Sequence, residues 1–237
     1  MLEAGDRSPR WGRPLVAVAA VLSLVAIWMG AFYVPMDRVQ GIVQKIFYMH
    51  VPMAWVAYLA FFVVLVGSVG YLWKRDPFWD RVARSSAEVG VLFTTLFLIM
   101  GSLWAKPIWN TWWTWDARLT STLVMWFIYV GYLMLRAYTP DQDRAARFGA
   151  VLGIVGFADV PIIHYSVEWW RTLHPEAIVV REQPQLPLEM GITLTVSMLA
   201  VTLVYAAIMV YRVYLERLED DNREIEAEAL PGGANHA

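Results

Sequence analysis

Hydrophobic residues occur along the chain in long blocks that are separated by short polar stretches. An α-helix rises about 1.5 Å per residue, so a block of about 20 residues crosses a hydrocarbon core about 30 Å thick. The pattern therefore predicts an all-α, polytopic membrane protein. Its six transmembrane helices are expected at residues 15–34, 47–72, 87–103, 119–135, 148–164 and 188–213.

The distribution of Lys and Arg predicts how these helices are oriented. Thirteen of these residues lie at the N-terminus, in the second and fourth loops and after the sixth block, whereas six lie in the other three loops. Because cytoplasmic loops are enriched in Lys and Arg, both termini are expected in the cytoplasm. The extracytoplasmic loops are then residues 35–46, 104–118 and 165–187. At the end of the first block, Tyr33, Val34 and Pro35 form no small-residue cleavage site for a signal peptidase. We therefore expect that block to stay attached.

The chain is expected to form one membrane domain with a polar tail. Residues 1–215 hold all six blocks, whereas residues 216–237 are mostly acidic and predict a cytoplasmic tail that is partly disordered. In the first outer loop, apolar residues from Met36 to Phe47 recur at helical spacing. This spacing predicts a short interfacial helix on the extracytoplasmic side, either as one wall of a site or as a connector.

Composition and charge narrow the chemistry that is available. Of the 237 residues, 58% are hydrophobic and 17% are charged, which fits a membrane protein better than a soluble domain. The chain has no cysteine, which excludes disulfides, thiolate ligands and covalent haem attachment through Cys-x-x-Cys-His. A net charge of −2 offers no basic surface for nucleic acid. We therefore expect any chemistry to use His, carboxylates or a bound cofactor.

Tryptophan is unusually concentrated in the second outer loop. Five of the 13 tryptophans lie within twelve residues, namely Trp104, Trp109, Trp112, Trp113 and Trp115. An interfacial aromatic belt accounts for isolated tryptophans elsewhere, but five indoles in one loop also suit a large, flat aromatic ligand that stacks on their faces. Asp116 and Arg118 close the loop where the fourth helix is expected to begin, and Asp116 is placed to cap that helix.

Three of the four histidines map to the same side of the membrane as this loop: His50, His164 and His174. Each alone fits a hydrogen-bonded interfacial residue, whereas two of them beside an aromatic platform fit axial ligands of haem iron. Haem also carries two propionates that need cations. The candidates are Arg118, Lys45, Lys106, Arg38 and Arg171, and each of them also fits ordinary snorkelling at the interface.

Two acidic residues allow two interpretations each. Asp159 lies within the fifth block just before Pro161, where a carboxyl group needs a proton or a partner. We expect it to be protonated and bonded to a backbone carbonyl that Pro161 leaves free, in preference to serving in a proton relay. Glu168 follows four residues after His164, and it is either an exposed loop carboxylate or a hydrogen-bond partner of a ligating histidine.

The chain resembles the CcmC family of cytochrome c maturation proteins, which are haem-handling membrane proteins with a tryptophan-rich "WWD" loop. The resemblance extends from the first to the sixth block. Three stretches carry it: residues 104–121, which end in WWTWDARLTS; residues 161–174, PIIHYSVEWWRTLH; and residues 48–55, YMHVPMAW. The chain departs from the family pattern where Ala105 and Asn110 replace glycine and where Arg171 and Pro175 replace asparagine and glutamine.

The resemblance implies that His50 and His174 ligate a non-covalent haem b on the extracytoplasmic face, with the WWD loop as its platform. It also implies delivery of this haem to a periplasmic haem chaperone, and a complex with the ATPase and membrane subunits of an ABC-type transporter and a small single-span subunit in the bacterial inner membrane. No motif of a hydrolase or phosphate-binding enzyme occurs, so we expect no enzyme in the usual sense. Two alternatives are a haem-translocating permease and a structural subunit that binds no haem.

Overall fold

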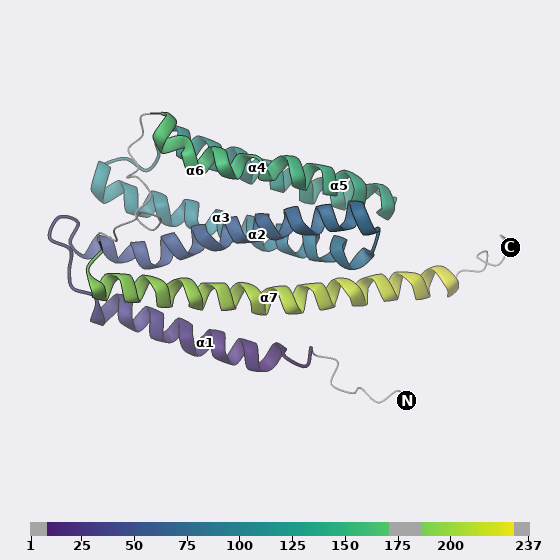
Figure 1. The fold of residues 1–237 in the computed structure, drawn as a ribbon, viewed down its shortest axis with the longest axis horizontal. Helices are drawn as coiled ribbons and strands as arrows, with labels where there is room; N and C mark the ends of the chain where they lie inside the picture. The colour runs from purple at the N-terminus through teal and green to yellow at the C-terminus, as the bar shows by residue number, and fades with distance from the viewer. Residues whose placement is uncertain (1–8, 171–185, 230–237) are drawn as a thin grey trace.

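A computed structural model describes residues 9–170 and 186–229, and these residues form helices and connecting turns without a strand (Figure 1). α1 runs directly into the π-helical segment η1, and the 3-10 helix η2 runs directly into α2. The elements are α1 (Gly12–Trp28), η1 (Met29–Tyr33), η2 (Ile42–Ile46), α2 (Phe47–Lys74), α3 (Pro77–Trp109), α4 (Ala117–Tyr138), α5 (Gln142–Phe157), α6 (Asp159–Trp169) and α7 (Leu188–Ala229).

The structure confirms the all-α prediction. Six helical stretches of the described chain are long and apolar enough to cross a membrane, and they coincide with the six predicted blocks. Several helices extend beyond the ends of the predicted blocks. α3 begins at Pro77, where Asp76 accepts a hydrogen bond from the backbone N–H of Phe78 at 2.8 Å and caps the helix. α7 continues to Ala229.

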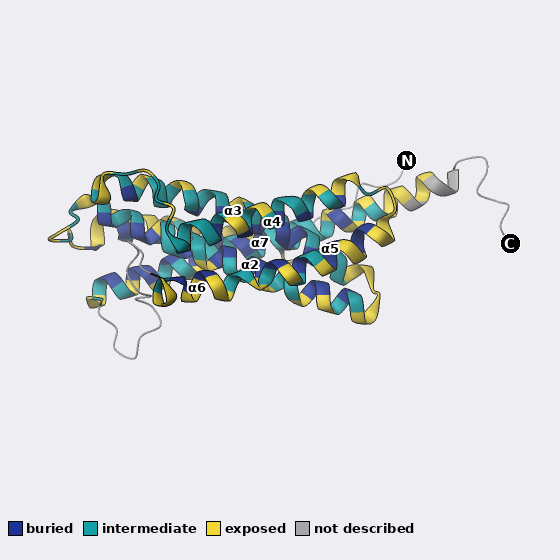
Figure 2. Ribbon diagram, turned by 90° about the horizontal axis from the view of Figure 1, so that it is seen from above, coloured by how far each residue is buried: buried dark blue, intermediate teal, exposed yellow. Residues whose placement is uncertain are grey.

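The helices lie side by side, and the start of α1 and the end of α7 lie at the same end of the bundle (Figure 1). We call this end the terminal end. The opposite end contains the last turn of α3 and residues 110–116, and we call it the tryptophan end. α7 is much longer than a bilayer requires, since 42 residues span about 63 Å, and its C-terminal part projects beyond the other helices at the terminal end (Figures 1 and 2).

α2 lies at the centre of the bundle and packs against α3, α5 and α7. Apolar burial contributes little between helices inside a bilayer, so close packing by small residues matters more. Phe61 of α2 stacks on Tyr129 of α4 with ring centroids 3.8 Å apart, and both side chains are fully buried. A Cβ atom on Gly90 of α3 would lie 2.6 Å from the Phe61 ring. Glycine at this position therefore permits the contact between α2 and α3.

Ion pairs join the helices at the terminal end. Arg136 of α4 forms a two-pronged pair with Asp80 of α3, at 2.5 and 2.6 Å. A second group joins α3 to α7 through Arg84–Glu216 at 2.9 Å, Arg212–Glu88 at 2.5 Å and Arg81–Asp220 at 3.0 Å. Glu216 is buried, and it also receives Arg212 at 2.8 Å. The charged side chains at this end thus pair with one another and join α3, α4 and α7, although the buried Nε of Arg212 has no acceptor among the described residues.

The fifth predicted helix is divided into two. α5 ends at Phe157 and α6 begins at Asp159, with a turn at Ala158. Pro161 is therefore in the first turn of a new helix, where its missing N–H costs nothing, and it does not kink a continuous helix. The Oδ2 atom of Asp159 is buried, and no described residue offers it a hydrogen bond. The expected bond between this atom and a freed carbonyl is not formed.

The first outer connection also differs from its prediction. Residues 36–41 form a turn with an isolated bridge between Asp37 and Gly41, and only residues 42–46 are helical before α2. Gly41 has a positive φ of 60°, a conformation that side chains disfavour. The apolar periodicity therefore predicted the second half of this helix correctly and the first half wrongly.

Candidate functional site

His50 lies in the first turn of α2 at the tryptophan end, against one face of α3. Phe97, Gly101 and Trp104 of α3 follow one another at helical spacing, so they form one stripe along that face. The imidazole ring is edge-on to Phe97 and to Trp104, with centroids 5.7 Å apart in both cases. His50 therefore lies beside Trp104, the first of the five clustered tryptophans.

Gly101 makes room for the imidazole. A Cβ atom at this position would lie 2.9 Å from the Cε1 atom of His50, a distance that real Cβ atoms do not show. The ring therefore occupies a cradle that only glycine permits. The rings of Phe97 and Trp104 and the close approach of Gly101 thus restrict how the imidazole can turn.

The tryptophan-rich segment follows directly from α3. Trp109 is the last residue of this helix, and Asn110 ends it in the left-handed conformation with φ 55°. Lys106 secures the turn by donating to the backbone oxygen of Asn110 at 3.2 Å and to its side-chain oxygen at 3.1 Å. The Lys106 ammonium also lies 6.0 Å from the Trp112 ring centroid. These hydrogen bonds thus fix the turn at Asn110, where the exposed part of the segment begins.

Asp116 ends the segment as the N-cap of α4, as the sequence predicts. It accepts a hydrogen bond from the backbone N–H of Leu119 at 3.0 Å and another from the hydroxyl of Thr114 at 3.0 Å. These bonds satisfy a donor that the start of a helix leaves open. Asp116 therefore anchors the segment to α4.

The indoles of this segment are unequally exposed. Trp109, Trp112 and Trp115 are 38%, 56% and 74% exposed. Trp113 is half-buried and lies edge-on to Trp115, with centroids 5.7 Å apart. Its Nε1–H is buried, and no described residue accepts a hydrogen bond from it. The segment thus presents open aromatic faces and an inner N–H donor that lacks a protein acceptor among residues 9–170 and 186–229.

Arg118 joins the segment to α6. Its Nη2 donates to the backbone oxygen of His164 at 3.2 Å. Its Nε is buried and has no acceptor within the described part of the chain. His164 itself is exposed and lies edge-on to Tyr165, with ring centroids 5.0 Å apart. Glu168 is also exposed, on the last turn of α6.

The remaining predicted residues are less closely grouped. Lys45 donates to the backbone oxygen of Ala31 at 2.5 Å, so its charge is held at the end of η1. Arg38 is exposed in the first outer turn. His174 and Arg171 lie outside the described residues, so the pairing of His50 with His174 remains a prediction.

The structure adds Gln40 to the residues around the site. The Nε1–H of Trp104 donates to the side-chain oxygen of Gln40 at 3.1 Å. Asp37 shapes the turn that contains Gln40, since its carboxylate accepts the N–H groups of Gln40 at 2.7 Å and Val39 at 2.8 Å. These two bonds lower the pKa of Asp37 below its ordinary value of 3.8. A Gln-Gly pair after an aspartate was the signal for a turn here, but nothing in the sequence connected it with Trp104.

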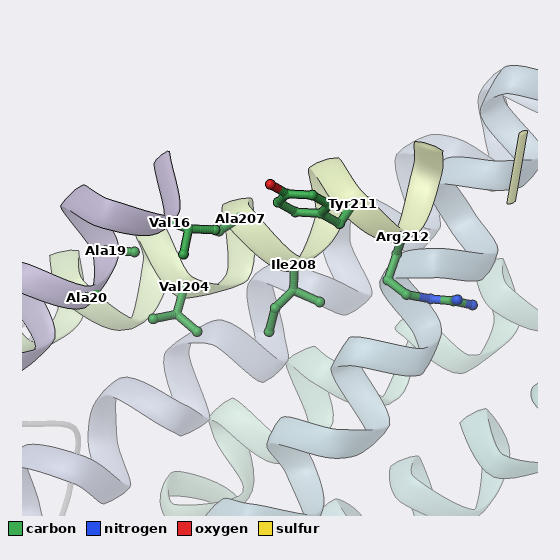
Figure 3. Close-up of a pocket in the computed structure, with 8 residues that line it drawn as sticks. All are labelled: Val16, Ala19, Ala20, Val204, Ala207, Ile208, Tyr211 and Arg212. Atoms are coloured by element: carbon green, nitrogen blue, oxygen red, sulfur yellow. The ribbon is translucent and has the colours of Figure 1, made fainter. Parts of the chain in front are cut away.

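A groove of about 390 Å³ lies between α1 and α7, apart from these residues (Figure 3). Val16 and Ala19 of α1 face Val204 and Ala207 of α7 across it, and Arg212 is at one end. The Arg212 guanidinium is already paired with Glu88 and Glu216. Among the described residues that line the groove, Tyr211 is the one aromatic residue, and none is a predicted site residue.

Fold and site together define a class: a polytopic helical membrane protein with an aromatic, histidine-containing site at one end of its bundle. A family model described as CcmC, heme exporter protein C, matches residues 6–228. The chain belongs to the CcmC family.

Individual relatives agree with this assignment. The chain is 42% identical to heme exporter protein C of Bradyrhizobium diazoefficiens over 70% of its length, a stretch that covers 63% of the relative, which is less than two thirds. It is 34% identical to heme exporter protein C of Haemophilus influenzae over 92% of its length and 89% of the relative. A putative cytochrome c biosynthesis ccmC-like mitochondrial protein of Marchantia polymorpha is 35% identical over 80% of this chain and 77% of its own.

Proposed function

We propose that this protein binds haem at the tryptophan end and passes it to a periplasmic haem chaperone during cytochrome c maturation. Membership of the CcmC family supports haem handling. The observation that carries the proposal is the contact of the His50 imidazole, a good iron ligand, with the Trp104 ring. The exposed indoles begin at Trp109, which lies about 7.5 Å further along α3 than Trp104.

The residues present fit a haem. The exposed faces of Trp109, Trp112 and Trp115 offer stacking surface for a porphyrin. The buried Nε1–H of Trp113 and Nε–H of Arg118 lack acceptors among the described residues, and carboxylates such as the two propionates are the acceptors that such donors favour. Burying unsatisfied donors costs free energy, so a ligand that supplies acceptors is stabilised there.

Each part of the site has a separate task in this proposal. His50 binds the iron from one side in an orientation that Gly101 and Trp104 restrict. His174 binds from the other side, as the family resemblance implies. Two neutral imidazoles hold haem b without a covalent bond, and the chain has no cysteine to form one. Because the indoles are exposed, the haem edge stays accessible for transfer, and the protein serves as a carrier and not as an enzyme.

The proposed setting follows from the same argument. In this proposal the protein lies in the bacterial inner membrane, with both termini in the cytoplasm and the tryptophan end in the periplasm. Its six apolar helices and the distribution of Lys and Arg support this setting. Its proposed partners are the ATPase and membrane subunits of an ABC-type transporter, a small single-span subunit and the haem chaperone. No role with nucleic acid is proposed.

Histidine variants test the proposal. Detergent-purified wild type, His50→Ala and His174→Ala proteins are compared by absorption spectra and by the haem that each one carries. Loss of an axial ligand is expected to lower the haem content at least tenfold or to shift the spectrum toward a five-coordinate form. His236→Ala is the matched control, because it removes an imidazole from the C-terminal tail.

Three results would overturn the proposal. Haem content and spectra that stay unchanged in both ligand variants would exclude these histidines as the ligands. Purification of the wild type without haem, together with failure to bind added haem, would favour a structural subunit. Transport of haem by the purified protein alone in liposomes would favour a permease.

A further inference from the structure

We propose that Gln40 is a positioning residue for the haem site, because it fixes the Trp104 indole against the His50 imidazole. This inference rests on the proposed function for its effect on haem, although the contact itself does not depend on a ligand. Gln40 lies in the first outer connection, 64 residues from Trp104 in the sequence, and its side chain accepts a hydrogen bond from the Trp104 indole.

The first step of the argument is the turn. The carboxylate of Asp37 accepts two backbone N–H groups, from Val39 and Gln40, and the N–H of Gly41 donates to the backbone oxygen of Asp37 at 3.1 Å. Gly41 then takes a positive φ that reverses the chain before η2. Three hydrogen bonds therefore fix the backbone on both sides of Gln40. The position of its Cα atom, from which the side chain extends, is thereby defined.

The second step is the hydrogen bond from Trp104 to Gln40. An indole has one donor and no acceptor, so its Nε1–H can be satisfied by only one kind of partner. The side-chain oxygen of Gln40 provides it at 3.1 Å, and both residues are partly buried. A partly buried N–H that loses its acceptor carries a desolvation cost, so the bond selects one orientation of the ring.

The third step connects the ring to the ligand. Trp104 lies edge-on to His50 at 5.7 Å and edge-on to Phe47 at 6.1 Å, so two rings of α2 and one ring of α3 meet. Edge-to-face pairs depend on ring orientation. Rotation of Trp104 would open one side of His50, while Gly101 on the same stripe of α3 leaves no alternative side chain to replace it. Gln40 thus acts on His50 through Trp104.

The experiment uses a pair of substitutions at one position. Gln40→Met keeps the length of the side chain but removes the oxygen acceptor, whereas Gln40→Glu keeps an acceptor. Gln142→Met is the matched control, because Gln142 is exposed at the start of α5, at the terminal end. Each full-length protein is purified in detergent with 15N-labelled tryptophan, and Trp104→Phe identifies the Trp104 indole signal among the 13.

Two readouts separate the contact from its consequence. In Gln40→Met the Trp104 indole signal is expected to move in the direction of a lost hydrogen bond, and in Gln40→Glu it is expected to remain in the hydrogen-bonded range. For haem, Gln40→Met is expected to weaken binding about threefold to tenfold, the scale of one hydrogen bond, and to shift the midpoint potential. Gln40→Glu is expected to restore binding, and Gln142→Met to match the wild type.

The outcomes distinguish this inference from the proposed function. An unmoved Trp104 signal in Gln40→Met overturns the contact. A moved signal with haem affinity and potential equal to the wild type overturns the positioning role and leaves the proposed function intact. A wild type that binds no haem overturns the proposed function and the positioning role with it.

Discussion

The two ends of the bundle are built from different chemistry. At the terminal end, charged side chains pair with one another, as Arg136 does with Asp80 and Arg84 with the buried Glu216. The tryptophan end combines aromatic side chains with buried N–H donors that lack an acceptor among the described residues. The buried donors of Trp113 and Arg118 have no acceptor in the part of the chain that the structure describes, and aromatic faces lie open beside them.

This difference separates a structural role from a binding role. The paired charges at the terminal end hold α3, α4 and α7 together through contacts within the protein. A group of donors and rings that is left unsatisfied has a free-energy cost that a ligand can remove. We therefore expect changes at the terminal end to alter stability and changes at the tryptophan end to alter haem binding. The following four predictions test that separation.

The largest effect is expected from Asp80→Ala at the terminal end. The substitution leaves the Arg136 guanidinium, which is 8% exposed, without its two-pronged partner. Loss of one member of a buried pair costs about 3 kcal/mol, so the free energy of unfolding in detergent is expected to fall by about that amount. The haem spectrum of the protein that stays folded is expected to be unchanged.

The matched control for Asp80→Ala is Asp143→Ala. Asp143 pairs with Arg147 at 2.8 Å, but both side chains are more than half exposed. An exposed pair contributes little, so the control should lower stability by less than about 0.5 kcal/mol. Equal losses in the two variants would show that the terminal end does not depend on its buried pair.

The next effect is expected from Gly101→Ala at the tryptophan end. The added methyl group meets the Cε1 atom of His50 at 2.9 Å, so the imidazole or the helix must move. Such overpacking is expected to weaken haem binding about tenfold, as measured by titration of apoprotein with haem. Gly131→Ala is the control, since no atom lies within 4 Å of the Cβ that it adds. Equal affinities for both variants would refute the cradle.

A smaller effect is expected from Trp113→Phe. This change keeps an aromatic ring but removes the Nε1–H that has no acceptor among the described residues. If the haem supplies that acceptor, affinity should fall about threefold. Trp73→Phe, at an 82% exposed position of the terminal end, should leave affinity unchanged. An affinity of Trp113→Phe equal to that of the wild type would exclude this N–H as a contact.

The smallest effect concerns pH. The N–H groups of Gln40 and Val39 lower the pKa of Asp37 in the folded protein. The two hydrogen bonds therefore stabilise the turn fully at pH values above the ordinary pKa of 3.8. This contribution is lost as pH falls through the lowered pKa. The Trp104 indole signal should therefore move on acidification below about pH 4 in the wild type, because the protonated Asp37 releases the turn. In Asp37→Asn the same movement should be absent, and a signal that titrates alike in both proteins would refute the connection.

The sequence predicted those features that depend on local pattern. Apolar blocks predicted six spans, because a bilayer sets their length, and Asp116 predicted the start of α4, because an N-cap is a local choice. The break before Asp159 was missed, since Pro161 suits both a kink and a first turn. Periodicity favoured a helix at residues 36–41, where Asp37 and Gly41 instead form a turn.

Contacts between distant segments were the part that sequence could not supply. His50 and the tryptophans were predicted from the sequence as site residues, but the contacts of Gly101 and Gln40 are with partners in other elements. A glycine in an apolar helix indicates close approach without naming what approaches. The relation of His50 to His174 is still a prediction from the family resemblance.

The most direct test of the account is the absorption spectrum of the detergent-purified wild-type protein, recorded oxidised and then reduced, followed by extraction with acidified organic solvent. We predict the bands of a six-coordinate haem with two imidazole ligands in both states, and complete release of the haem on extraction, because no covalent bond holds it. A protein that shows no haem bands, even after haem is added, would contradict the account. Haem that resists extraction would contradict the non-covalent site.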